Sequence, residues 1–136
     1  MLKYPLILAA ALLMTAAAHA DTAATEAMSQ ARLAAFAKGD VETLLAQHAD
    51  NAVIIAPSGV IDTPEARRAL VIQTIAAFAV PDMKFTMVSA TARDDLLTYV
   101  WTAETPTTDF GTGVETYVLK DGRIVYHTEY FNSKAK

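Results

Sequence analysis

The stretch KDGRIVYHTEYFN, residues 120–132, is the last strand-like run of the chain. The pair Asp121-Gly122 stands between two β-rich runs, which is typical of a two-residue hairpin turn. Side chains two residues apart in a strand point to the same face, so His127 and Glu129 share one side. That side faces either a pocket or solvent. The choice depends on strand register, because a slip of one residue would turn both side chains to the other face of the sheet.

Helices are indicated mainly in the first half of the chain. Residues 21–39 are alanine-rich and predict a helix, and Asp40 is a suitable N-cap for a short second helix at 41–49. The segment 62–81 predicts a longer helix, with Thr63 as its N-cap. It is apolar on most of its circumference towards its end, so we expect it to be covered on more than one side.

Strands dominate the second half. A β-branched run, NAVIIAPSG (51–59), precedes the long helix, and the later strand-like runs cover 83–93, 96–104, 113–120 and 122–132. We expect the last four to form an antiparallel meander. The segment 105–112 is expected to be a connecting loop, and Gly111-Thr112-Gly113 a turn and bulge. Helices segregated from an antiparallel sheet predict an α+β fold in one domain, residues 21–136.

Composition narrows the classes of function. The formal net charge is −4 and the sequence has no run of basic residues, which argues against nucleic acid and anionic membrane as partners. The chain contains no cysteine, which excludes disulfides, thiol catalysis and zinc–thiolate sites. It also carries no cofactor-binding motif, so we expect neither a cofactor nor a metal.

The first twenty residues, MLKYPLILAAALLMTAAAHA, have the pattern of a secretory signal peptide. Lys3 is followed by an apolar stretch and then by Ala18-His19-Ala20, an A-x-A cleavage site. We therefore expect cleavage after Ala20 and a periplasmic or secreted protein. No cysteine follows the site, so we expect no membrane anchor after cleavage.

Three segments in this order resemble a known family: AKGDVETLLAQHADNAVIIAPSG (37–59), the capped helix, and DGRIVYHTEYFN (121–132). Together they are similar to the SnoaL-like and ketosteroid isomerase-like proteins of the nuclear transport factor 2-like superfamily. The resemblance implies a cone-shaped fold, in which a curved antiparallel sheet wraps around helices and one deep pocket. It also implies that the protein is often a homodimer, formed through the sheet.

The catalytic positions of the relatives are only partly kept. By resemblance, the ketosteroid isomerase base falls at Ala56, its oxyanion tyrosine at Arg32 and its third group at Glu115. The catalytic aspartate of limonene-type epoxide hydrolases falls at Glu129. Their remaining positions fall on residues that cannot replace them: Val53, Ile55, Trp101 and Ala103. Steroid-type isomerisation is therefore not expected, and catalysis is left open.

Strand alternation, combined with the family's pocket-facing positions, predicts which side chains face the cavity. Two carboxyls, one imidazole and three aromatic side chains converge: Tyr99, Trp101, Glu115, Tyr117, His127 and Glu129. On the helix 21–39, Arg32 shares a face with Met28 and Phe36, and Arg32 and Phe36 are expected in the pocket. Arg32 would neutralise Glu115, bind a substrate carboxylate or lie in solvent. His48 is expected to end a short helix in a structural role.

Three functions remain open from the sequence. The first is binding of a small, largely apolar molecule in the pocket. The second is a lyase, isomerase or hydrolase in which Glu129 is the acid or base, His127 assists and Glu115 tunes the pair. The third is a dimerisation or association module with a vestigial pocket, acting through outward residues: Thr98, Thr116, Tyr126 and Tyr130.

Overall fold

The computed structural model describes residues 21–136, so the predicted signal peptide lies outside the described residues. These residues form three helices and seven strands, in the order α1 (Thr22–Lys38), α2 (Val41–Ala46), β1 (His48–Ala56), β2 (Gly59–Ile61), α3 (Pro64–Phe78), β3 (Lys84–Arg93), β4 (Leu96–Glu104), β5 (Thr108–Lys120), β6 (Arg123–Tyr130) and β7 (Lys134–Ala135). Within 21–136, no helix is long and apolar enough to cross a membrane.

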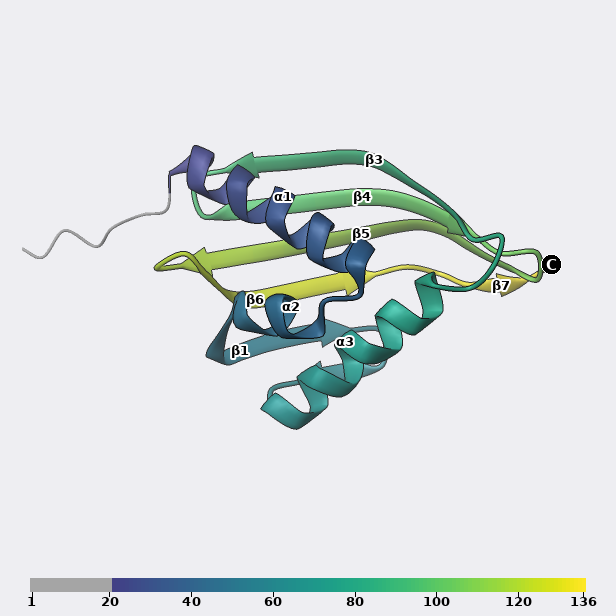
Figure 1. Ribbon diagram of the computed structural model, residues 1–136, viewed down its shortest axis with the longest axis horizontal. Helices are drawn as coiled ribbons and strands as arrows, with labels where there is room; N and C mark the ends of the chain where they lie inside the picture. The colour runs from purple at the N-terminus through teal and green to yellow at the C-terminus, as the bar shows by residue number, and fades with distance from the viewer. Residues whose placement is uncertain (1–20) are drawn as a thin grey trace, which may run out of the picture.

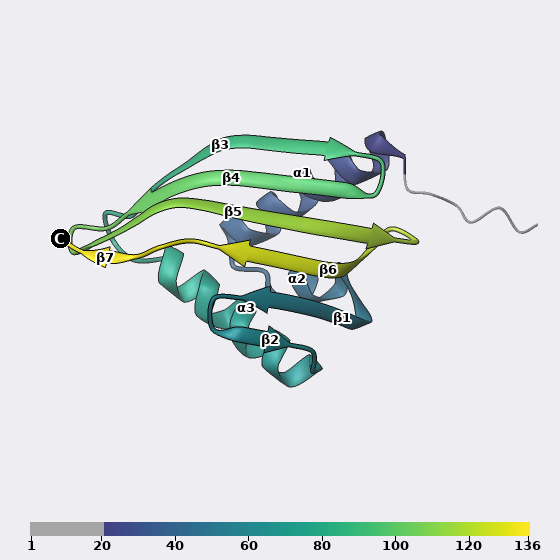
Figure 2. The ribbon, with the colours of Figure 1, turned by 180° about the vertical axis from the view of Figure 1, so that it is seen from behind.

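The strands form one curved sheet in the order β2-β1-β6-β5-β4-β3, with β7 paired to the start of β5. The expected antiparallel meander from β3 to β6 is confirmed. However, β1 runs parallel to β6, so the sheet is mixed and not wholly antiparallel as expected. All three helices cover the same face of this sheet (Figure 1), and the opposite face carries no helix (Figure 2).

Capping residues define the helix boundaries, and two of them, Asp40 and Thr63, are the N-caps predicted from the sequence. The Asp21 carboxylate accepts a hydrogen bond from Ala24 N at 2.7 Å, and the Asp40 carboxylate accepts one from Thr43 N at 3.0 Å. Thr63 caps α3 through Ala66 N at 3.2 Å. Gly39 ends α1 with φ 66°, a left-handed conformation that glycine adopts without steric cost.

The second helix is shorter than predicted, and His48 does not belong to it. The chain leaves the helix at Gln47, whose carbonyl accepts a hydrogen bond from Ile124 N at 2.8 Å. This contact draws the chain into the sheet, and His48 becomes the first residue of β1 with 1% of its surface exposed. The expectation of a cation at a helix end is therefore wrong.

The helix α3 is less covered than its composition predicts. Only Arg67 and Val71 are buried in it, and Ile72 is 49% exposed. Its inner side packs on α2, while its outer side faces away from the sheet (Figure 1). The expectation that this helix is covered on more than one side is wrong for the single chain.

The predicted loop at 105–112 is also too long, because β5 already begins at Thr108. Gly111, with φ 59°, lies where the register between β4 and β5 shifts, which agrees with the predicted bulge. Gly113, in contrast, is a regular strand residue opposite Trp101. The indole of Trp101 occupies the space above it.

We expect Gly113→Ala to destabilise the fold. A Cβ at this position would meet the Trp101 ring at 2.1–2.5 Å, so the indole must move out of a closely packed core. The expected loss is about 1–3 kcal/mol of unfolding free energy, measured by urea denaturation. Thr112→Ala, at the exposed neighbouring position, is the control and should cost less. Equal midpoints for the two variants would show that the indole does not need this space.

Candidate functional site: two glutamates in an apolar cavity

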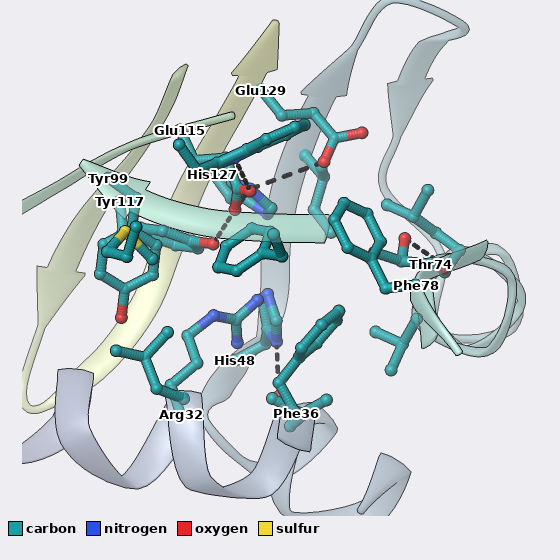
Figure 3. A pocket seen from close by; sticks show the side chains of 18 residues that line it. Arg32, Phe36, His48, Thr74, Phe78, Tyr99, Glu115, Tyr117, His127 and Glu129 are labelled. Atoms are coloured by element: carbon teal, nitrogen blue, oxygen red, sulfur yellow. Dashed lines mark hydrogen bonds and ion pairs between the residues drawn. The ribbon is translucent and has the colours of Figure 1, made fainter. Parts of the chain in front are cut away.

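A cavity of about 80 Å³ lies between the helices and the inner face of the sheet (Figure 3). All eight side chains predicted for the pocket line it: Arg32, Phe36, Tyr99, Trp101, Glu115, Tyr117, His127 and Glu129. Aliphatic and aromatic side chains make up most of the remaining wall, including Leu44, Ile54, Val71 and Phe78. Binding pockets for drug-sized ligands usually measure about 300–1,000 Å³, so this cavity favours a small ligand.

Strand register brings the polar groups together. Glu115 on β5 stands directly opposite Tyr99 on β4 and Glu129 on β6. Tyr117 stands opposite His127, and their rings stack at 4.3 Å with an interplanar angle of 21°. Directly opposite residues in an antiparallel ladder have their side chains about 5 Å apart.

Glu115 is held by two hydrogen-bond donors. Trp101 Nε1 donates to Glu115 Oε1 at 2.8 Å, and the Tyr117 hydroxyl donates to Glu115 Oε2. His127 Nε2 lies 3.4 Å from the same Oε2. Burial raises the pKa of this carboxyl, but His127, the Tyr117 hydroxyl and the Arg32 cation outweigh burial and lower its pKa to about 2. Glu115 is therefore ionised at neutral pH.

Glu129 has the opposite environment. His127 Nε2 lies 4.0 Å from Glu129 Oε2. Burial raises the pKa of this carboxyl to about 7, and the negative charge of Glu115 adds to the effect. Glu129 is therefore present in both protonation states near neutral pH, beside a glutamate that is ionised.

His127 is buried between the two carboxyls, with 4% of its surface exposed. Among the described residues, neither of its ring nitrogens has a hydrogen-bond partner of good geometry. Burial lowers the pKa of His127, although Glu115 favours the charged ring. The resulting neutral imidazole can accept or donate a hydrogen bond within the cavity.

The opposite wall of the cavity carries Arg32 and His48. The Arg32 guanidinium lies over the Tyr117 ring at 4.7 Å and donates to Gln47 Oε1 at 3.2 Å. His48 Nδ1 lies 3.0 Å from the Leu44 carbonyl oxygen, which can only accept, so Nδ1 carries the proton. Burial lowers the pKa of His48 to about 3, and the Arg32 charge contributes, so this ring is neutral.

Sequence reasoning missed His48 as a cavity residue. The alternation of inward side chains on β1 covers Ala52, Ile54 and Ala56 but breaks at the exposed Asp50, and the pairing of β1 with β6 shifts between His48 and Val53. The sequence therefore contains no continuous period-two signal for His48, and the helix assignment for 41–49 covered it. Thr74 and Phe78 on α3 were missed as well, because α3 is apolar on several sides and shows no single inward stripe.

The family positions on β1 need one correction. Ile55, which matches a water-positioning residue of the epoxide hydrolases, points outward and is 49% exposed. The inward residues of this strand are Ala52, Ile54 and Ala56, all apolar and buried. The wall formed by β1 beyond His48 therefore offers no base and no group to hold a water.

Spacing alone would allow a cation at the two glutamates and His127, because one ligand atom from each lies within 4.8 Å of the others. Both oxygens of Glu115 already accept hydrogen bonds from Trp101 and Tyr117. The Arg32 charge also acts on both carboxyls. The donor set thus fits a metal poorly, and a metal-free site stays our prediction.

Comparisons with known proteins agree with this architecture. Solved structures that share the fold include a nuclear transport factor 2-like protein from Mesorhizobium loti (19% identity over 82% of this chain and 93% of that chain, TM-score 0.67). A SnoaL-like protein from Burkholderia thailandensis matches at 17% identity (85% of this chain, 99% of that chain, TM-score 0.65). A candidate ketosteroid isomerase from Kribbella flavida also matches at 17% identity (83% of this chain, 81% of that chain, TM-score 0.63).

The search of curated proteins finds no match. The model of the SnoaL-like domain family, in contrast, matches residues 29–127, from α1 into the last long strand. This range contains all the residues that line the cavity except Glu129. The α+β architecture, the nuclear transport factor 2-like neighbours and the family match agree, and the chain belongs to the SnoaL-like domain family.

Proposed function

We propose that this protein binds a small, largely apolar molecule in the cavity and that Glu129 exchanges a proton with it. One feature carries the proposal: two glutamates whose pKa values are shifted in opposite directions face one apolar cavity. Pairs of carboxyls whose environments push their pKa values apart are typical of acid–base sites. The reaction class is a lyase, isomerase or hydrolase.

In this proposal, each polar group has a different task. Glu129, with a pKa of about 7, can take a proton from the bound molecule and return it at neutral pH. Glu115 stays ionised under its two donors, which prevents it from acting as the acid and keeps the pKa of Glu129 high. His127 lies between them and can orient the Glu129 carboxyl.

This arrangement differs from steroid isomerisation. The position of the ketosteroid isomerase base is Ala56, which is buried and has no titratable group. The position of the oxyanion tyrosine is Arg32, a cation. The proposed proton carrier instead lies near the C-terminal end of β6, where the epoxide hydrolase resemblance places an acid.

Ligand recovery tests the binding part of the proposal. The protein is purified from its own host and denatured, and the compounds released from it are analysed by mass spectrometry. In parallel, a library of lipophilic compounds is screened by thermal shift. We expect recovery of one small, mostly apolar compound class, and melting temperatures that rise with compounds of this class. Repeatedly empty protein together with no thermal shift across the library would contradict binding.

The uncovered face of the sheet supports a second, compatible role in assembly. Its outward side chains include Tyr126 at 55% and Tyr130 at 61% exposure, and Leu96 at 50%. A row of exposed aromatic and aliphatic side chains on a helix-free face favours association. We propose a homodimer through this face, and light scattering that gives a monomer mass at micromolar concentration would contradict it.

Export is proposed on the sequence pattern of residues 1–20 alone. The proposal is a periplasmic or secreted protein whose mature chain begins at Asp21. N-terminal sequencing of the protein from the periplasmic or culture fraction tests it. A chain that keeps its first twenty residues in the cytoplasmic fraction would contradict export.

A further inference from the structure

Arg32 is a cation on the cavity wall. The proposed proton transfer by Glu129 gives it no role. Among the described residues that line the cavity, it is the only lysine or arginine. Its contacts include the Gln47 side-chain oxygen at 3.2 Å, the face of the Tyr117 ring at 4.7 Å and the Tyr117 hydroxyl, which raises the pKa of Arg32. Within residues 21–136, none of the ion pairs includes Arg32.

Most of the hydrogen-bonding capacity of this guanidinium is left for a ligand. A guanidinium has five N–H donors in a planar fork, and Gln47 accepts one of them. The side chain extends from α1 into the cavity, between Tyr117 and His48 (Figure 3). His48 next to it is neutral, so Arg32 provides the positive charge of this wall. A cation among apolar side chains is costly to desolvate unless an anion accompanies it.

The Glu115 carboxylate, whose charge raises the pKa of Arg32, is already engaged in hydrogen bonds with other residues. Glu115 acts on Arg32 through space, but its oxygens accept hydrogen bonds from Trp101 and Tyr117. The fork therefore has no protein carboxylate within reach for a bidentate pair. A planar carboxylate matches its geometry, because two parallel N–H groups can donate to the two oxygens.

We propose that the ligand of the cavity is a small carboxylic acid with an apolar body, whose carboxylate is held by Arg32. This inference rests on the proposed function, namely that the cavity binds a small, largely apolar molecule. Arg32 rises from α1 on one side of the cavity, and Glu129 lies on the opposite side (Figure 3). The apolar body then lies against Phe36 and Phe78 and presents its reacting atom to Glu129, away from the carboxylate.

The test compares matched pairs of probes. Benzoate, phenylacetate, cyclohexanecarboxylate and hexanoate are each titrated against their neutral carboxamides by isothermal calorimetry at pH 7, using the purified protein. We expect the carboxylates to bind about tenfold more tightly than the carboxamides, which corresponds to one charge-assisted bidentate pair. The carboxamides keep the shape of the probes but remove the charge and replace one acceptor oxygen by an NH₂ group, which cannot accept from the guanidinium.

Variants at Arg32 test whether this residue causes the preference for carboxylates over carboxamides. Arg32→Gln should abolish it while changing carboxamide affinity by less than about threefold, because the apolar wall remains. Arg32→Lys keeps the charge without the planar fork, so it should retain part of the preference. If circular dichroism shows that Arg32→Gln is unfolded, Arg32→Lys takes its place. Arg68→Gln removes an exposed arginine that pairs with Glu42 and should behave as the wild type.

The outcomes separate the two proposals. Equal binding of carboxylates and carboxamides, or a preference that survives in Arg32→Gln, would overturn the carboxylate assignment and leave the binding function intact. A charge preference that Arg68→Gln also loses would show that net charge, and not Arg32, is responsible. If no probe of either series binds, the proposed binding function is overturned together with this assignment.

Discussion

Glu115→Gln should lower the free energy of unfolding by about 2 kcal/mol at pH 7. This is less than the full lowering of the Glu115 pKa to about 2 would give, because His127, the largest cause of that lowering, is neutral at this pH. Glutamine keeps the shape of the side chain and can still accept from Trp101 Nε1. What is lost is the negative charge of Glu115, which acts on the Arg32 cation without forming an ion pair with it. Removing one partner from a buried group of charges is among the more costly single substitutions.

The pH dependence of this loss has a definite sign. The folded state lowers the pKa of Glu115, so the carboxylate contributes stability above its ordinary pKa of 4.5. That contribution disappears as the pH falls through about 2. Urea midpoints of wild type and Glu115→Gln should therefore differ most at pH 5–8 and converge in acid. The exposed Glu65→Gln is the control, and a Glu115→Gln midpoint equal to that of the control would contradict the ionised state.

Glu129→Gln should have the opposite effect on stability. The folded state raises the pKa of Glu129 to about 7, so the favourable protonated form is fully present below pH 4.5 and is lost as the pH rises through about 7. Glutamine resembles the protonated form at every pH. After allowance for the partial exposure of this side chain, the variant should be about 2 kcal/mol more stable than wild type at pH 8, with little difference at pH 4.5.

The same substitution should remove proton transfer. An amide cannot take up the proton, and the loss of a general acid or base typically lowers turnover by about 10²–10⁴-fold. Turnover is measured on the compound recovered with the protein, and Glu65→Gln again serves as the control. A variant that is more stable at pH 8 but inactive agrees with a functional site that costs stability. Unchanged turnover in Glu129→Gln would exclude Glu129 as the proton carrier.

The sequence was sufficient to predict the polar wall because strand parity on a buried face is strongly specified. In β4, β5 and β6, a slip of one residue would move Tyr99, Trp101 and Tyr117 into solvent, so the apolar pattern holds the register. The hairpin turn at Asp121-Gly122, with φ 52° and 74°, connects β5 and β6 as the sequence predicted. Glu115 and Glu129 then follow with the same parity.

Other features depend on contacts that a local pattern does not contain. The parallel pairing of β1 with β6 joins His48 to Ile124, two segments far apart in the chain. The strands β2 and β7 are only three and two residues long, too short for a periodic signal. The hydrogen bond of 2.8 Å between Ser29 and Tyr99 likewise requires α1 to be placed on the sheet first.

The different states of the two glutamates also lie beyond the sequence. Glu115 and Glu129 face each other across neighbouring strands and have equal ordinary pKa values. The difference arises because His127, the Tyr117 hydroxyl and the Arg32 charge lower the pKa of Glu115 by more than burial raises it. Glu129 receives no hydrogen bond from the Tyr117 hydroxyl and remains beside the resulting negative charge. The sequence indicated two acids, and side-chain geometry determines which one carries the proton.

A carboxyl titration by NMR tests this assignment most directly. Protein labelled with ¹³C-glutamate is titrated from pH 3 to pH 9, and Glu115→Gln and Glu129→Gln assign the two resonances. We predict that the Glu129 resonance moves with a midpoint near pH 7, while the Glu115 resonance stays at its ionised position over this range. A Glu129 midpoint near its ordinary value of 4.5, or a Glu115 resonance that titrates near neutral pH, would contradict the account.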